Sequence, residues 1–69
     1  MVEQRIKEYL DEQGITQVWL SRKTGLDINK LNAALNGKRR ITLEEYEGIC
    51  WALDVPADKF LEARKPAWA

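Results

Sequence analysis

The segment from residue 28 to residue 36 carries short amide and methyl side chains that a buried core does not require. Leu31, Ala34 and Leu35 repeat at the spacing that places them along one buried side of a helix. The opposite side carries Ile28, Asn29, Asn32, Ala33 and Asn36. Side-chain amides both donate and accept hydrogen bonds, so they can distinguish between chemical groups on a partner. This pattern indicates a helix whose exposed side recognises another molecule.

Basic residues gather around this segment, although the chain has 11 basic and 11 acidic residues and no net charge. The basic residues between positions 15 and 41 are Arg22, Lys23, Lys30, Lys38, Arg39 and Arg40. Asp27 is the one acid in that range, and the flanking segments are both net acidic. A run of charge usually forms only a solvated surface. Because this cluster coincides with the helix described above, it favours a nucleic-acid partner.

Local signals predict that five helices position these residues. The predicted helices run from Val2 to Gln13, from Gln17 to Lys23 or Thr24, from Ile28 to Leu35 or Asn36, from the N-cap at Thr42 to a break at Val55 and Pro56, and over a short segment that begins at Asp58. Threonine or aspartate stands where three of the helices need an N-cap, at Thr16, Asp27 and Thr42. Glycine follows three of the helices, where a left-handed residue is favoured. The fold class is therefore all-α, with a helix-turn-helix over residues 17–36.

The spacing of apolar residues also assigns each helix an inner side. On the first helix we expect Ile6 and Leu10 to face inward and Glu3 to face outward. The inward residues expected on the fourth and fifth helices are Leu43, Tyr46, Ile49, Cys50, Leu53, Phe60 and Leu61. Gly48 inside the fourth helix is either a point of close approach by another element or a glycine that the helix tolerates.

Length and composition exclude several classes of function. Sixty-nine residues make one domain, which we expect to cover residues 1–64 and to be followed by a tail over 65–69. The single Cys50 and the absence of histidine exclude a disulfide and the usual catalytic or zinc-binding groups, so we expect no enzyme activity and no cofactor. No segment is apolar enough to cross a membrane, and the predicted location is the cytoplasm.

The ordered set of residues from Ile15 to Leu61 resembles the Xre family of helix-turn-helix regulators, which includes the lambdoid phage repressors and Cro. The matching residues are Thr16-Gln17, Leu20-Ser21, Thr24-Gly25-Leu26, Leu31, Asn36-Gly37-Lys38, Thr42-Leu43, Ile49, Ala52-Leu53, Val55 and Phe60-Leu61. The resemblance implies a five-helix, lambda-repressor-like domain that represses transcription as a homodimer on a palindromic operator. It also implies that the helix over residues 28–36 enters the major groove of double-stranded DNA.

The family assigns roles to matching positions of this chain. Phosphate contacts are expected from Gln17, Arg22, Lys23, Asn36, Lys38, Arg39 and Arg40. Base contacts are expected from Ile28, Asn29, Lys30, Asn32 and Ala33. The dimer surface is expected at Trp51, Val55, Pro56, Ala57, Asp58 and Lys59. No small-molecule ligand is implied.

Two departures from the family pattern have consequences. Relatives often carry an arginine at the position of Leu10 and a glutamate at that of Leu35, which form a buried ion pair. Exchanging such a pair for apolar residues is often neutral or stabilising, because both charges escape desolvation. The second departure is at the base-contacting surface, where relatives commonly carry glutamine, serine, threonine or arginine and this chain carries Ile28, Asn29, Asn32 and Ala33. Asn29 suits the bidentate contact to adenine, and Ile28 or Ala33 suits a thymine methyl. We therefore expect an A·T-rich half-site, with Lys30 on a guanine or a phosphate.

Trp19, Trp51 and Trp68 keep a second function open. Exposed tryptophans are enriched at protein interfaces. The alternative is a module that retains the helix-turn-helix fold but binds a protein through these residues, as an antitoxin or antirepressor does. The other possibility for Trp68 is that it folds back over one of the other two tryptophans.

Overall fold

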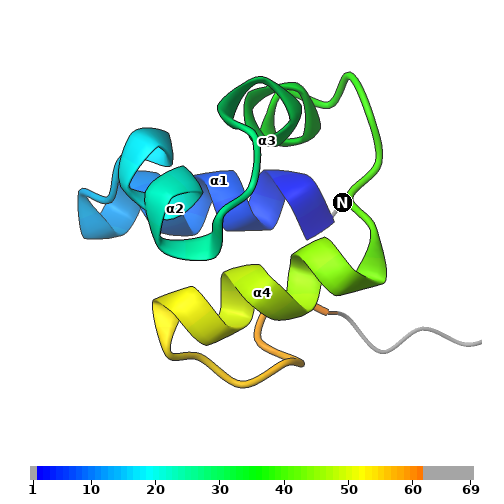
Figure 1. Cartoon of the computed structure of the whole chain (residues 1–69). Helices are drawn as coiled ribbons and strands as arrows, with labels where there is room; N and C mark the ends of the chain where they lie inside the picture. Colours follow the sequence, from blue (N-terminus) through cyan, green and yellow to red (C-terminus); the bar gives the residue numbers. More distant parts are fainter. Residues whose placement is uncertain (1, 62–69) are drawn as a thin grey trace, which may run out of the picture.

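The computed structural model describes residues 2–61 and contains four helices in that range. They are α1 (Val2–Gln13), α2 (Gln17–Thr24), α3 (Ile28–Leu35) and α4 (Leu43–Leu53). α3 and α4 lie at opposite edges of the molecule, with α1 and α2 between them (Figure 1). Residues 2–61 contain no strand, so the all-α prediction is confirmed for the described part of the chain.

Side-chain caps start three of the helices at the predicted residues. The Thr16 Oγ1 accepts the backbone N–H of Trp19 at 3.1 Å, and the Asp27 carboxylate accepts the N–H of Asn29 at 2.8 Å. Thr42 and Glu45 form a reciprocal capping box at the start of α4. These bonds satisfy backbone donors that have no partner within a helix. The local signals therefore fix where α2, α3 and α4 begin.

Gly25 allows the chain to turn between α2 and α3. Its φ of 79° lies in the left-handed region, where a side chain would be strained. Its N–H donates to the carbonyl of Ser21 at 2.8 Å. The Ser21 hydroxyl in turn donates to the carbonyl of Leu26 at 2.6 Å. The turn is thus closed by hydrogen bonds on both sides, which holds α2 and α3 in a fixed relation.

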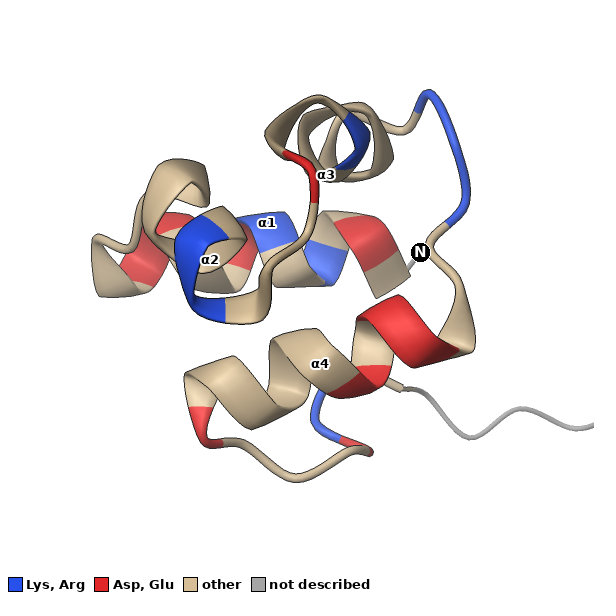
Figure 2. Cartoon of the chain, in the orientation of Figure 1, with Lys and Arg blue, Asp and Glu red and all other residues tan. Residues whose placement is uncertain are grey.

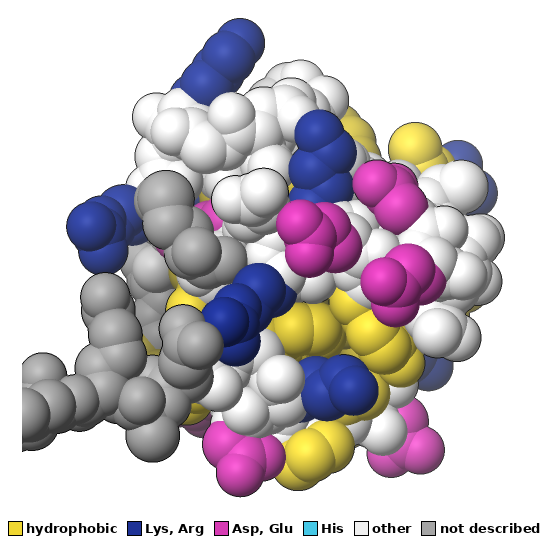
Figure 3. Space-filling view, turned by 180° about the vertical axis from the view of Figure 1, so that it is seen from behind, with side chains coloured by type: hydrophobic (Ala, Val, Ile, Leu, Met, Phe, Trp, Pro, Cys, Tyr) yellow, Lys and Arg dark blue, Asp and Glu magenta, His cyan; other side chains and the backbone are white. Residues whose placement is uncertain are grey.

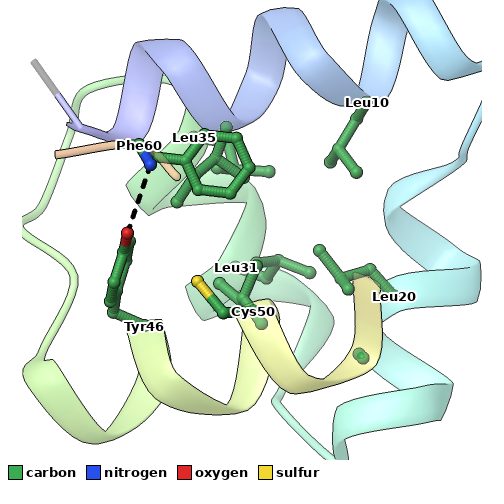
Figure 4. Close-up of a cluster of buried hydrophobic side chains, with 10 residues drawn as sticks. Leu10, Leu20, Leu31, Leu35, Tyr46, Cys50 and Phe60 are labelled. Carbon is green, nitrogen blue, oxygen red and sulfur yellow. Dashed lines mark hydrogen bonds between the residues drawn. The ribbon is translucent and has the colours of Figure 1, made fainter. Parts of the chain in front are cut away.

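All four helices contribute side chains to one hydrophobic core. α2 packs against both α3 and α4, and α1 packs against α3. The buried apolar residues are Ile6, Leu10, Leu20, Leu31, Ala34, Leu35, Tyr46, Ile49, Cys50, Ala52 and Phe60. Figure 4 shows seven of these, labelled, converging from the different helices. Leu10 and Leu35, at the positions of the ion pair expected in relatives, are 2% and 3% exposed.

The prediction of a fifth helix from Asp58 is not confirmed. Residues 57–60 form turns, closed by hydrogen bonds from the Lys59 N–H to the Pro56 carbonyl at 3.0 Å and from the Leu61 N–H to the Asp58 carbonyl at 3.2 Å. Bonds that span three residues close a turn but do not continue an α-helix. The tail over residues 65–69, with Trp68, lies outside the described residues.

Tyr46 anchors this turn segment to α4. Its hydroxyl donates to the Ala57 carbonyl at 2.5 Å and accepts the Phe60 N–H at 3.4 Å (Figure 4). The Phe60 ring packs edge-on against Tyr9 at a centroid distance of 5.5 Å. Phe60 therefore closes the core as predicted, whereas Leu61 is 52% exposed and the prediction that it faces inward is wrong.

Two other assignments of sides are corrected by the structure. Leu43 was expected inside but is 73% exposed, because the first residue of α4 lies beyond the edge of the core. Glu3 was expected outside but is only 7% exposed, because its carboxylate accepts the Ile41 N–H at 3.0 Å. At Gly48 an added Cβ would meet no atom within 4 Å. Gly48 is therefore a tolerated glycine rather than a point of close approach.

None of the described helices is long and apolar enough to cross a membrane.

Candidate nucleic-acid interface

The predicted base-contacting residues share one exposed side of α3. Ile28, Asn29, Lys30 and Asn32 are exposed, and Ala33 is half-buried. The buried residues of α3 point the other way, and they include Leu31, Ala34 and Leu35. A helix that fixes one side in the core presents the other in a defined orientation. The exposed side of α3 is thus a rigid surface of amides and small apolar groups.

The amides on this surface differ in what they already bind. Asn36 donates through Nδ2 to the Oδ1 of Asn32, and its own Oδ1 accepts the Lys7 Nζ at 3.4 Å. The Asn29 side chain makes no hydrogen bond to any other residue within 2–61, so its donor and acceptor are both available. Sequence reasoning missed Lys7, because it belongs to α1 and no local pattern connects it with α3.

Gln17 begins α2, as predicted, and is half-buried. The cap at Thr16 takes up the N–H of Trp19, and Gln17 stands in the same first turn. The amino end of a helix attracts anions, because its dipole is positive there and its first N–H groups have no intrahelical partner. Gln17 is therefore placed where a phosphate can be bound by an amide and by backbone donors together.

The structure separates Lys23 from the other predicted phosphate contacts. Lys23 lies near the carboxyl end of α2, and its Nζ is 5.4 Å from the centre of the Trp51 ring on α4. That contact is a cation–π interaction. The neighbouring Arg22 is exposed. Lys23 is thus directed toward α4.

The basic loop, residues 38–40, contains one cation that is already paired. The Arg39 Nη2 lies 3.1 Å and 3.3 Å from the two carboxylate oxygens of Glu45, and its Nη1 donates to the Lys30 carbonyl at 3.4 Å. Lys38 and Arg40 are exposed. In Figure 2 this loop lies beside α3 at the same edge of the molecule. Arg39 therefore holds the loop against α3 and α4, while Lys38 and Arg40 project into solvent.

Two carboxylates from other helices fix this loop. The Ile41 N–H that Glu3 accepts holds the pKa of that carboxyl below its usual range, and nearby Arg40 acts in the same direction. The Thr42 N–H that Glu45 accepts lowers the pKa of Glu45, with a further contribution from Arg39. Both shifts outweigh the opposing effect of burial. No local pattern in the sequence indicates that Glu45 pairs with Arg39.

The residues predicted for a dimer surface belong to one segment, which runs from the second half of α4 into the turns that follow it. Trp51 is 67% exposed, Val55 is half-buried, and Pro56, Ala57, Asp58 and Lys59 are exposed. The Lys59 Nζ lies 5.4 Å from the centre of the Tyr9 ring. Trp19 on α2 is 44% exposed. Their use as a dimer surface stays a prediction.

Charges are unevenly distributed over the molecule. Viewed from behind, acidic side chains gather on one part of the surface, with basic side chains beside them (Figure 3). Glu8, Asp11 and Glu12 of α1 are all exposed. The loop of Lys38 and Arg40 lies at the edge formed by α3 (Figure 2). A polyanion is therefore attracted to the edge formed by α3 and this loop.

One of three comparisons with known proteins gave a match, the comparison with models of protein families. Comparisons with curated proteins and with solved structures gave no match. The model of the Cro/C1-type HTH DNA-binding domain matches residues 5–65. The match includes the helix-turn-helix of α2 and α3 and the residues predicted to contact DNA, which identifies a domain of a family of regulators that bind double-stranded DNA. The chain therefore belongs to the family of Cro/C1-type helix-turn-helix DNA-binding domains.

Proposed function

We propose that this protein is a transcriptional repressor that binds a palindromic operator as a homodimer, with α3 of each copy in the major groove. The observation that carries the proposal is the exposed side of α3, where Ile28, Asn29 and Asn32 are not used by the core. The amino end of α2 and the basic loop lie on either side of it in the chain. In helix-turn-helix proteins the second helix contacts base edges and the first crosses the backbone.

Affinity in this proposal comes from phosphate contacts. Gln17 contributes the amino end of α2, and Lys38 and Arg40 contribute the exposed cations of the loop. Asn36 and Arg22 are assigned further phosphate contacts. Arg39 contributes indirectly, since its guanidinium is bound by Glu45 and fixes the loop. Phosphate neutralisation releases counterions from DNA and supplies much of the binding free energy.

Sequence preference comes from α3. Asn29 has a free donor and acceptor, which match the N7 and N6 groups of adenine. Ile28 and Ala33 supply apolar contact to thymine methyls, and Lys30 adds a guanine or a phosphate. The half-site is therefore A·T-rich at its core. A protein that acts on an operator in this way works in the cytoplasm, at the nucleoid.

Selection of bound sequences from a random pool of double-stranded DNA tests this function. The wild type is expected to return an A·T-rich half-site repeated in inverted orientation. Asn29→Ala is expected to lose about 1–3 kcal/mol of discrimination at one A·T pair and to keep the other positions. Gln4→Ala, which removes an exposed amide from α1 that binds Glu8, is the matched control. A half-site core made of G·C pairs alone contradicts the proposal.

The homodimer has its own test. Trp51, Val55 and the residues up to Lys59 form the surface that we assign to it. Sedimentation of the protein with and without the selected operator is expected to show two protomers on each palindrome. Trp51→Ala is expected to weaken operator binding without changing the sequence preference of a half-site. One protomer on each palindromic operator contradicts the dimer.

The exposure of Trp19 and Trp51 supports a second candidate function, a module that binds a protein partner. Salt distinguishes the two candidates. DNA binding weakens steeply with salt, with a slope near −0.9 for each neutralised phosphate on a logarithmic plot. Binding through tryptophan side chains responds little to salt, because burial of apolar surface involves no counterion release. A partner complex that survives high salt favours the module.

A further inference from the structure

We propose that Lys7 is a positioning residue that sets the hydrogen-bonding character of Asn32 through Asn36. In this arrangement Asn32 offers only its amide donors to DNA, whereas Asn29 offers both a donor and an acceptor. The inference rests on the proposed function, since it concerns how α3 contacts bases. It goes further by predicting which kinds of base stand opposite Asn32.

The first step is the contact between α1 and the end of α3. Lys7 and Asn36 line the same groove between these elements. The Lys7 Nζ lies 3.4 Å from the Oδ1 of Asn36. An ammonium has three donors and no acceptor, so it can pair only with the oxygen of an amide. Lys7 therefore selects one of the two amide orientations of Asn36 and turns its Nδ2 away from α1.

The second step passes this orientation along α3. Asn32 and Asn36 are four residues apart, so they are neighbours on one side of the helix. The Asn36 Nδ2 donates to the Oδ1 of Asn32. Because the Asn36 nitrogen can only donate, Asn32 must turn its oxygen toward Asn36. The two N–H groups of Asn32 are then the part of that amide directed away from Asn36.

The fold withdraws Glu3 as a competing partner for Lys7. Glu3, one turn earlier on α1, would be a natural ion-pair partner at this spacing. Its carboxylate is instead turned inward and accepts the Ile41 N–H at 3.0 Å, where it is 7% exposed. Lys7 thus reaches Asn36, and the hydrogen bond between them is strengthened by the charge of the ammonium.

The consequence is a specific preference at one base. In the major groove guanine presents two acceptors and thymine presents one, whereas cytosine presents an amino donor. An Asn32 that presents only donors is compatible with guanine or thymine and opposes cytosine. Asn29, with its free donor and acceptor, retains the bidentate contact to adenine. The two asparagines of α3 therefore specify different bases, although their side chains are identical.

Selection from a random DNA pool tests the inference on the full chain. Asn32→Ala first identifies the position that Asn32 contacts. At that position the wild type is expected to disfavour cytosine, and Lys7→Met is expected to lose about fivefold of that discrimination, the size of one net hydrogen bond. Lys7→Arg, which restores a cationic donor, is expected to recover it. Loss of a positive charge alone would lower affinity for all sequences equally and would leave this preference unchanged.

A second variant is expected to reverse the preference. Asn36→Asp has only acceptors, so it can bind both Lys7 and the Nδ2 of Asn32. Asn32 then turns its oxygen outward, and the preferred base at its position changes to one with an amino donor, cytosine or adenine. If Lys7→Met and Asn36→Asp both leave the preference at this position as in the wild type, the inference is overturned.

A measurement without DNA separates this inference from the proposed function. In NMR spectra of the free protein, the side-chain amide signals of Asn36 and Asn32 are expected to shift together in Lys7→Met, while those of Asn29 stay in place. A folded Lys7→Met protein with unchanged Asn36 and Asn32 amide signals overturns the inference. If the wild type selects no DNA sequence, the proposed function fails, and the amide signals alone decide whether Lys7 orients Asn32.

Discussion

Leu10 and Leu35 stand at the two positions where the resemblance to the family predicts a buried ion pair between the first and third helices. Both leucines lie in the core, at 2% and 3% exposure. Two apolar side chains avoid the desolvation cost that a buried ion pair incurs. A leucine at one of these positions cannot pair with a charge at the other. The apolar core is therefore maintained only when both positions are apolar.

Leu35→Glu is expected to lower the free energy of unfolding by about 3 kcal/mol or more. The substitution places a charge at a core position that is 3% exposed, and the cost of burying a charge there is large. Urea denaturation at pH 7 measures the effect. Leu35→Met keeps the side chain apolar and is the control, with a loss expected below about 1.5 kcal/mol. Equal stability of the glutamate variant and the wild type would contradict this account of the core.

At the scale of elements, the loop between α3 and α4 is held by side chains from three places in the chain. Glu3 of α1 accepts the Ile41 N–H, and Glu45 of α4 accepts the Thr42 N–H at 2.9 Å. Arg39 links the loop to Glu45 and to the Lys30 carbonyl of α3. The loop that carries the exposed cations is thus part of the packed structure.

These contacts make stability depend on pH on the acid side. Because the pKa values of Glu3 and Glu45 are lowered in the folded protein, the unfolded state binds more protons as the pH falls. The stabilisation is complete above the ordinary glutamate pKa of about 4.3 and is lost as the pH falls through the lower folded values. Unfolding free energies measured between pH 7 and pH 2 are expected to fall less steeply for Glu3→Gln than for the wild type. Parallel curves for the two proteins would contradict this role of Glu3.

Glycines inside and between helices are expected to respond oppositely to alanine. Gly48→Ala is expected to stabilise the protein by about 1 kcal/mol, because an added Cβ meets open space in the middle of α4. Gly25→Ala is expected to destabilise it by about 1 kcal/mol or more, because φ is 79° in the turn between α2 and α3. Thermal unfolding of the two variants beside the wild type measures both effects. A destabilised Gly48→Ala would show that α4 needs that glycine for another contact.

At the scale of the whole molecule, the neutral chain has a strongly uneven charge distribution. Cations occupy the loop beside α3, whereas α1 carries both signs of charge (Figure 2). The overall charge of zero therefore gives no guide to its partner. The field of the loop favours the approach of DNA at the edge formed by α3.

The salt dependence of DNA binding is expected to follow the exposed cations of the loop. Lys38→Ala and Arg40→Ala are each expected to reduce the slope of log affinity against log salt by about 0.9 for every phosphate that the variant no longer neutralises. Arg39→Ala is expected to change the slope less and to lower the unfolding free energy, because its guanidinium binds Glu45. Titration of operator binding at several salt concentrations, together with urea denaturation, separates the two effects. An equal reduction of slope by all three variants would contradict the structural role of Arg39.

The sequence by itself determined the four helices and the residues that α3 exposes. Caps at Thr16, Asp27 and Thr42 and the apolar spacing of each helix act within a few residues, so they can be recognised locally. The predicted bounds of α1 agree with the structure at both ends. Ile28, Asn29 and Asn32 were correctly expected on the exposed side for the same reason.

Tertiary structure alone decided how those exposed groups are held and paired. The burial of Glu3 depends on Ile41, which is 38 residues away, and the orientation of Asn36 depends on Lys7 on another helix. The pairing of Arg39 with Glu45 links the loop after α3 to α4, and the Tyr46 hydroxyl links the turns at residues 57–60 to α4. Periodicity shows which side of a helix is free, but a hydrogen bond between distant segments forms only where the fold brings donor and acceptor within hydrogen-bonding distance.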